Sequence, residues 1–387
     1  MGKTFKKIDK VLLVLTILFC VLGLLMIFSA SSVSTVLRYK VPEYYFFSRQ
    51  VVFIMAGCIV GFILVKIPVE WYRILCVPYL LLIIVLLFGL YIYGSVKGNA
   101  QSWYDLGMFS IQPTEFAKTA IIVFYAFFYE GLERAKIKGL FWYFIPLIIS
   151  FAIAFVVYKQ PDMGSALIIL AMSFLIFINV PYIKKNFLEV VRIFSILVFI
   201  GSIGLLILTL SGKSILTKGQ LDRFNFSHPC DRYTEKTGYQ VCNGLIAMSS
   251  GGLTGVGLNN STQKRLYLPE SHTDFIFPII VEELGLIAGV IIILMYLVLL
   301  LRIRNIGKHG ENIHCGLIGY GVYWYISLHV VINILGVLAL IPLTGVPLPF
   351  LSYGGSFTMN LIAILFLVQK CCVESKTLKL RREIKEL

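Results

Sequence analysis

The chain has 387 residues, of which 58% are hydrophobic and 14% charged, and its mean hydropathy is +0.86. Ordinary soluble domains are about a quarter charged, so this balance excludes a soluble enzyme. The formal net charge of +14 must therefore first be examined as a signal of membrane topology, before nucleic-acid binding is considered.

Apolar stretches recur along the chain, and most are long enough to cross a bilayer, which takes about 20 residues. The first stretch follows four lysines, as in a signal peptide, but its apolar core is too long for one and predicts a retained anchor. A polar segment at about 212–272 separates the seventh stretch from the eighth. The ten predicted spans are approximately 11–30, 50–66, 74–94, 113–129, 140–158, 164–181, 188–211, 273–300, 315–340 and 354–372.

Basic residues divide unequally between the two sides of these spans. With a cytoplasmic N-terminus, 20 of the 34 Lys and Arg residues are cytoplasmic, in segments 3–10, 66–73, 134–138, 184–185, 302–308 and 370–385. This positive-inside bias predicts that both termini are cytoplasmic and that the 212–272 loop is extracytoplasmic. The expected fold is an all-α polytopic membrane protein of about ten helices. It forms a single transmembrane domain over 1–387 with a cytoplasmic tail at about 373–387, and nothing indicates a nucleic-acid partner.

Ionisable residues at membrane depth are costly, so each one indicates a functional site unless a simpler role explains it. Glu115 and Lys118 stand three residues apart on one predicted helix face and can neutralise each other. A purely structural ion pair is the alternative. Asp162 lies close to Lys159 in a turn that contains Pro and Gly, and this segment alone is equally well a simple polar turn.

The start of the eighth span carries the strongest polar signal. Thr273 could cap the helix with Asp274 in its first turn, and that arrangement would explain Asp274. It does not explain Glu282 and Glu283, which lie about 12–13 Å deeper at a rise of about 1.5 Å per residue. Three acids along one span predict a polar cavity open to the outside. The Pro- and Gly-rich stretch 342–356 is predicted to face it, because non-helical backbone at membrane depth lies buried in protein or lines a cavity.

Cysteine use agrees with this topology. Of the eight cysteines, only Cys230 and Cys242 fall in the long outer loop. They could form a disulfide there or remain two thiols. No Cys/His spacing resembles a zinc site, so no residue is assigned as a metal ligand.

Six short motifs make the chain resemble the SEDS family of bacterial cell-wall proteins, which includes FtsW, RodA and SpoVE. The resemblance covers nearly the whole chain and agrees with the ten-span count and the long outer loop. The motifs are IQPTEFAK (111–118), QPDMG (160–164), GYQ (238–240), GGLTGVGL (251–258), YLPESHTDFIF (267–277) and PLPFLSYGGS (347–356).

This resemblance implies a peptidoglycan glycosyltransferase that polymerises lipid II, an undecaprenyl-pyrophosphate-linked disaccharide-peptide, at the bacterial plasma membrane. The position that matches the family's catalytic acid is Asp274, which would take the proton of the acceptor sugar's 4-hydroxyl. Cations beside it would stabilise the anionic pyrophosphate leaving group. The positions expected to bind substrate are Arg49, Glu115, Lys118, Asp162, Lys264, Glu270, His272, Asn333 and Ser352.

The resemblance also implies partners: a class B penicillin-binding protein that crosslinks the strands, and other divisome or elongasome membrane proteins. It establishes no cofactor and leaves open a divalent cation, Mg or Mn, at the pyrophosphate. Ser102 and Ser110 stand where relatives often carry Arg, which weakens any phosphate-binding scheme that relies on those arginines. The sequence of the 259–270 segment is closer to that of the FtsW members of the family, so septal synthesis is favoured over elongation.

Two other functions fit the same composition. One is a lipid II flippase or transporter, typical of ten helices with acids in a cavity. Transporters usually bind substrate near the midplane in paired broken helices, whereas these acids cluster at the outer rim and no internal repeat is visible. The other is a non-catalytic scaffold for a penicillin-binding protein, for which Asp274 would be dispensable.

Overall fold

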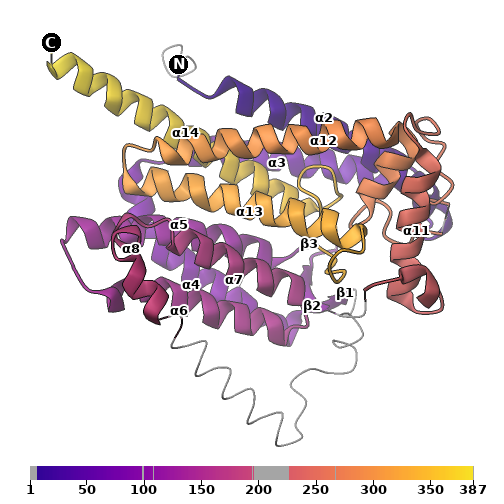
Figure 1. The fold of residues 1–387 in the computed structure, drawn as a ribbon, viewed down its shortest axis with the longest axis horizontal. Helices are drawn as coiled ribbons and strands as arrows, with labels where there is room; N and C mark the ends of the chain where they lie inside the picture. The colour runs from indigo at the N-terminus through magenta and orange to yellow at the C-terminus, as the bar shows by residue number, and fades with distance from the viewer. Residues whose placement is uncertain are drawn as a thin grey trace, which may run out of the picture.

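A computed structural model describes residues 7–97, 100–107, 109–193, 195, 226–265 and 267–386. Within these residues the protein is a bundle of long helices, as predicted (Figure 1). Seven of the described helices are long and apolar enough to span a membrane. They are α2 (Lys10–Leu37), α3 (Tyr45–Lys66), α4 (Val69–Tyr93), α6 (Leu140–Lys159), α12 (Ile276–Lys308), α13 (Ile313–Val337) and α14 (Gly355–Glu386).

Two further predicted spans are also helices, although they do not meet both criteria for a span. The helix α5 (Pro113–Arg134) has 22 residues, with five charged side chains along it, and α7 (Met163–Phe177) has 15 residues. A short helix, α8 (Pro181–Lys185), follows α7. Most of the predicted span 188–211 lies outside the described residues. The total of ten spans therefore stays a prediction, while the multi-pass membrane fold is confirmed.

The helices pack side by side along the long axis of the molecule (Figure 1). The helix α13 packs against α5, α7, α12 and α14, and α3 packs against α14. Because α5 is covered by α4, α6, α7, α13 and α14, polar side chains on it face protein rather than lipid. This environment allows charged residues at membrane depth.

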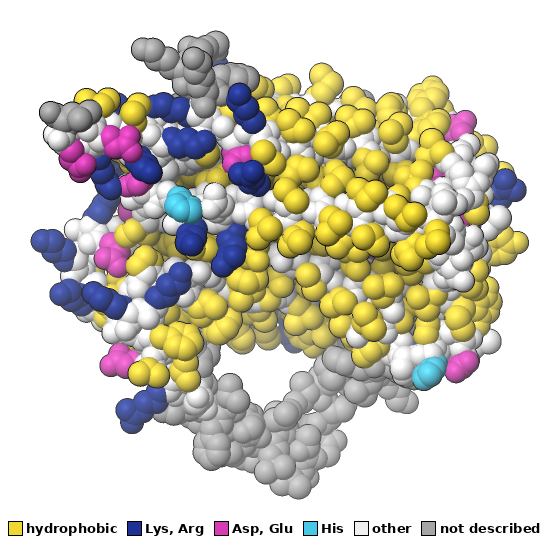
Figure 2. Space-filling model, turned by 45° about the horizontal axis from the view of Figure 1, so that its top comes forward, with side chains coloured by type: hydrophobic (Ala, Val, Ile, Leu, Met, Phe, Trp, Pro, Cys, Tyr) yellow, Lys and Arg dark blue, Asp and Glu magenta, His cyan; other side chains and the backbone are white. Residues whose placement is uncertain are grey.

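The surface carries the charge distribution expected of a membrane protein. A hydrophobic belt covers the middle of the molecule, and most Lys and Arg side chains in view gather at the end that holds both termini (Figure 2). Exposed Val, Leu, Ile and Phe side chains on α3, α4 and α12 supply much of this apolar surface. The arrangement agrees with the predicted placement of both termini on one side of the membrane.

The end opposite the termini is more structured than its loops suggested. A small antiparallel sheet with the order β1-β2-β3 connects α4 to α5, through β1 (Ser95–Lys97), β2 (Ala100–Asp105) and β3 (Ser110–Ile111). The outer loop contains a 3-10 turn, η1 (Pro229–Arg232), and the helix α11 (Lys236–Gly251). Figure 1 shows α11 standing across this end of the bundle. A disulfide joins Cys230 to Cys242 and fixes η1 to α11.

The helix α12 is interrupted at Gly285, where φ is +87°. Segment 252–257 satisfies the backbone groups freed there: Val256 N–H donates to the Glu282 carbonyl at 2.9 Å and Gly257 N–H donates to the Glu283 carbonyl at 3.0 Å. A Cβ atom at Gly285 would lie 2.3 Å from the carbonyl oxygen of Leu253. The interruption therefore needs glycine both for its backbone angle and for the close approach of this segment.

Candidate active site

The turn that carries Asp274 precedes α12 rather than forming its first turn. The helix begins at Ile276, and its N-cap, Phe275, makes no side-chain capping bond. Thr273 instead donates its hydroxyl to the Glu270 carboxylate at 3.0 Å, and the Phe275 N–H donates to the Glu270 carbonyl at 3.1 Å. The alternative in which Thr273 caps the helix and Asp274 lies in its first turn is thus wrong, because the chain closes a separate turn on Glu270.

The Pro- and Gly-rich loop 342–356 holds this turn, as the sequence predicted for its position. Ser352 donates its hydroxyl to the Thr273 carbonyl at 2.6 Å and accepts the Leu348 N–H at 2.8 Å. The Tyr353 N–H donates to the His272 carbonyl at 2.8 Å. Ser352 therefore fixes the loop and the turn to each other. It does so by bonding backbone groups of both segments, which the spacing of the motifs does not predict.

Asp274 lies between this loop and α13. A Cβ atom at Gly345, where φ is +71°, would lie 3.2 Å from Asp274 Oδ2, so the loop approaches the carboxylate without a side chain in between. Asn333 on α13 donates to the Asp274 carbonyl and to the Val346 carbonyl, each at 2.8 Å. Its Oδ1 is buried and has no donor among the described residues. Asn333 thus joins three elements and keeps one acceptor unused.

The surroundings of Asp274 suit proton transfer near neutral pH. Burial, with a smaller contribution from the Glu270 carboxylate, raises the pKa of Asp274 from 3.8 to about 7. A general base works best when its pKa lies near the operating pH. Of the three acids predicted to share a cavity, Glu282 and Glu283 lie within α12, and Asp274 lies in the turn that precedes it.

His272 is 2% exposed and lies in an aromatic cluster that the sequence reading missed. Its ring centroid is 4.4 Å from that of Phe46, and Tyr39 and Tyr353 contact it edge-on or tilted. Burial, with a smaller contribution from the Arg38 guanidinium, lowers the pKa of His272 to about 4, so the ring is neutral at physiological pH. The run of aromatic residues at 44–47 was the available signal for this cluster.

The Glu115–Lys118 pair on α5 forms with a 2.9 Å contact, and the two side chains are 2% and 1% exposed. The Tyr325 hydroxyl donates to Glu115 Oε2 at 3.1 Å, and Lys118 Nζ lies 3.1 Å from His329 Nε2. Both partners come from α13 and were missed, because a lone Tyr or His in an apolar helix usually belongs to the core.

Two other predicted residues, Asp162 and Arg49, have different kinds of partner. Asp162 caps α7 by accepting the Ser165 N–H at 3.0 Å, and it also accepts a bond from Gln112 at 3.1 Å. The Arg49 guanidinium lies 4.4 Å from the centroid of the Tyr45 ring. Asp162 therefore links the start of α7 to the segment that leads into α5.

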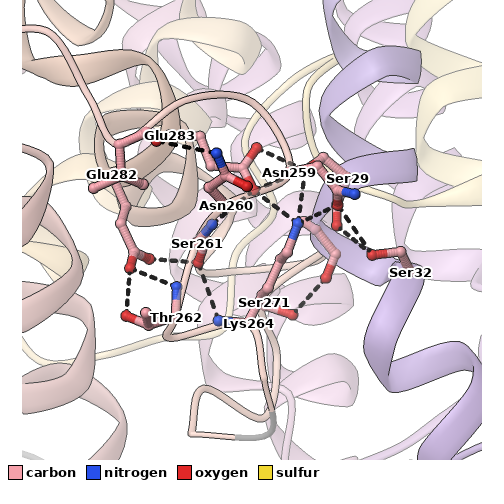
Figure 3. Close-up of polar contacts among 12 residues, drawn as sticks. Ser29, Ser32, Asn259, Asn260, Ser261, Thr262, Lys264, Ser271, Glu282 and Glu283 are labelled. Atoms are coloured by element: carbon pink, nitrogen blue, oxygen red, sulfur yellow. Dashed lines mark hydrogen bonds and ion pairs between the residues drawn. The ribbon is translucent and has the colours of Figure 1, made fainter.

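Glu282 and Glu283 do not line an open cavity, which corrects the prediction of three acids sharing one. Both are buried, and each is satisfied from within the protein (Figure 3). Glu282 accepts bonds from the Thr262 N–H at 2.9 Å and the Thr262 hydroxyl at 2.8 Å, and from the Ser261 hydroxyl. Their function is to bind the returning loop to α12, since buried carboxylates need such partners.

Lys264 belongs to the same buried cluster. Its ammonium lies 2.9 Å from Glu283 Oε1 and 3.1 Å from Ser29 Oγ, it also donates to Asn259, and the side chain is 1% exposed (Figure 3). Ser29 is on α2, so this cluster ties α2, the outer loop and α12 together. The geometry favours a structural ion pair over a cation available to substrate.

One group of potential metal ligands occurs among the described residues. His314, Cys315 and Glu374 each bring a ligand atom within 4.8 Å of the others. His314 and Cys315 lie in the first turn of α13, whereas Asn333, which bonds the Asp274 carbonyl, lies in the last turns of the same helix. A divalent cation at the pyrophosphate stays a prediction.

Comparisons with known proteins agree with this architecture. The probable peptidoglycan glycosyltransferase FtsW of Bacillus subtilis is 34% identical over 365 residues, covering 93% of this chain and 89% of that protein. The stage V sporulation protein E of the same organism is 35% identical, covering 92% and 94%.

Solved structures share the fold. A chain of a peptidoglycan synthase complex superposes with a TM-score of 0.74 at 24% identity, over 95% of this chain and 98% of that chain. The rod shape determining protein RodA of Thermus thermophilus superposes with a TM-score of 0.65 at 23% identity, over 94% and 96%. The family model described as "Cell cycle protein" matches residues 9–377, so the chain belongs to the FtsW/RodA/SpoVE family of cell cycle proteins.

Proposed function

We propose that this protein is a peptidoglycan glycosyltransferase that polymerises lipid II into glycan strands at the outer face of the bacterial plasma membrane. The observation that carries the proposal is Asp274, an acid with a pKa of about 7, held between α13 and the Gly345 loop at the end opposite the termini. The names of the similar FtsW proteins support the reaction class.

In this reaction the acceptor sugar's 4-hydroxyl attacks the anomeric carbon of the donor, and the bond from that carbon to the lipid pyrophosphate breaks. Ionised Asp274 accepts the hydroxyl proton as the new glycosidic bond forms. The lipid pyrophosphate leaves with the bonding electrons, so cations near the donor lower the barrier.

Among the cations proposed from the sequence, Arg49 and Lys118 are the candidates we retain. Lys264 is enclosed by Glu283, Ser29 and Asn259, and we assign it to holding the loop.

The other proposed site residues have different roles, which follow from the groups that each one contacts. Glu270 closes the Asp274 turn and adjusts its acidity, while Ser352 fixes the turn to the facing loop. Asn333 Oδ1 is a buried acceptor that suits a sugar hydroxyl or amide donor. Three further residues complete the proposed set: Glu115 orients Lys118, Asp162 fixes the start of α7, and neutral His272 supports the turn from the aromatic side.

We further propose a class B penicillin-binding protein as the partner that crosslinks the strands, together with other divisome or elongasome membrane proteins. Support comes from the fold shared with a chain of a peptidoglycan synthase complex. The FtsW-like segment 259–270 and the similarity to FtsW proteins favour a role in septal synthesis over elongation.

The test supplies lipid II to the purified protein with its partner and follows strand length. Wild type should form strands and Asp274→Asn should not, while Asp231→Asn, at an exposed outer-loop acid, should match wild type. Equal strand formation by Asp274→Asn would reject Asp274 as the base. Lipid II transfer across vesicles without strand formation would favour the flippase, and neither activity with any partner would favour the scaffold.

A further inference from the structure

Three side chains at four-residue intervals, Tyr325, His329 and Asn333, form a polar stripe on one face of α13. Tyr325 bonds Glu115, His329 contacts Lys118, and Asn333 bonds the Asp274 carbonyl. The stripe therefore touches both halves of the proposed site. Its central member, His329, is 1% exposed and lies between the other two.

The two ring nitrogens of His329 face different partners. Nε2 lies 3.1 Å from Lys118 Nζ, and Nδ1 lies 3.3 Å from the Pro347 carbonyl oxygen. A lysine ammonium has only donors, so Nε2 must carry no proton and must accept. The ring proton is then on Nδ1, where it donates to the Pro347 carbonyl. If both ring nitrogens were protonated, the ring would be a second buried cation in contact with Lys118, and the hydrogen bond from Lys118 to Nε2 would be lost.

The Pro347 contact reaches Asp274 through consecutive loop residues. Pro347 bonds His329, Val346 bonds Asn333, and Gly345 lies against the Asp274 carboxylate. A displacement of His329 thus moves both the Lys118 ammonium and the loop that borders Asp274.

Lys118 also has one donor left over. Its ammonium has three N–H groups, of which one is bound to Glu115 and one to His329. The third has no hydrogen-bond acceptor among the described residues, where the ammonium also lies 5.8 Å from the centroid of the Tyr325 ring. A buried donor of this kind is costly unless a ligand oxygen completes it. An oxygen of an anionic diphosphate ester is a suitable acceptor.

We propose that His329 is a positioning residue. As a neutral imidazole with its proton on Nδ1, it aims the free N–H of Lys118 at the diphosphate of the glycosyl donor and sets the distance from Lys118 to Asp274. This inference rests on the proposed function, because the diphosphate is the donor's leaving group.

The first test reads the ring directly, in full-length protein labelled with ¹⁵N-histidine, with His329→Gln assigning the resonance. At neutral pH, Nδ1 should be protonated and Nε2 bare. Lys118→Met should move the Nε2 resonance, whereas Lys159→Met, at an exposed lysine of the outer end, should not. The proposal is overturned if Nε2 is protonated in the wild type. It is also overturned if Lys118→Met leaves the chemical shift of Nε2 unchanged. This measurement needs no activity, so it stands apart from the proposed function.

The second test measures strand synthesis against lipid II concentration. His329→Gln keeps one acceptor and one donor and should stay within a few-fold of wild type, whereas His329→Leu should lower kcat about 10- to 100-fold. Thermal unfolding of both variants checks that the bundle is intact. Equal losses in Gln and Leu variants, or no loss in either, overturn the proposal. Failure of wild type itself to make strands overturns the proposed function instead.

Discussion

The amide group of Asn333 donates to the main-chain carbonyl of Asp274, 2.8 Å away, and to that of Val346 at the same distance. One side chain of α13 thereby fixes the proposed base relative to the loop that faces it. This bond acts on the backbone of Asp274, so it sets the position of the carboxylate without competing for its proton.

Asn333→Ala should therefore slow strand synthesis about 10- to 100-fold, because the Asp274 turn and the loop lose their shared anchor. Initial rates with lipid II at saturating concentration measure the effect. Asn186→Ala is the matched control, since the side chain of this asparagine donates to the Tyr182 carbonyl of its own helical turn. Wild-type rates for Asn333→Ala would show that the anchor is not needed for catalysis.

The pH dependence of the reaction should report the Asp274 carboxylate. Because burial and Glu270 raise its pKa to about 7, the rate should rise with pH through about 7 and then level off as the base ionises. Glu270→Gln removes the neighbouring like charge, so the midpoint should fall by about 0.5 to 1 pH unit. Initial rates across a pH series test this, with exposed Glu235→Gln as the control. An unchanged or higher midpoint in Glu270→Gln would contradict the electrostatic explanation.

The same pKa makes Asp274 costly for folding. Between pH 3.8 and about 7 the folded protein keeps a proton that the unfolded chain has released, so stability falls as pH rises through this window. Asp274→Asn should therefore raise the free energy of unfolding by about 1–3 kcal/mol above this window and change it little below. Thermal unfolding in detergent at both ends of the window measures the difference. Exposed Asp231→Asn should show no such dependence, and a loss of stability in Asp274→Asn would contradict the prediction.

The sequence predicted most of the helices because apolar length is a local property. It also placed Asp274 and loop 342–356 together, since both interrupt apolar spans at the same outer end. It could not show that segment 252–257 returns to fill a break in α12, because Gly285 inside an apolar run is compatible with a continuous helix. From the sequence alone, the depth of Glu282 along the helix therefore indicates a cavity, whereas in the structure its carboxylate is bound by Ser261 and Thr262.

His329 and Phe46 were missed for a related reason. Each is an ordinary member of an apolar helix when read alone, and its role depends on a partner distant in the chain, Lys118 for His329 and His272 for Phe46. Lys264 shows the converse, because a lysine beside a motif suggests a substrate cation until its buried partner Glu283 is seen.

Variants of Lys264 and Glu283 should separate these two interpretations of Lys264. If the pair is structural, Lys264→Met leaves a buried carboxylate without its cation, and Glu283→Gln leaves the cation without its carboxylate. Each single variant should then lose about 3–5 kcal/mol of stability, and the double variant should recover part of the loss. Thermal unfolding of the three variants, with lipid II titrations on each, provides the comparison. If Lys264→Met instead unfolds like wild type and only raises the KM for lipid II, Lys264 is the substrate cation that the sequence suggested, and the buried pair is dispensable for folding.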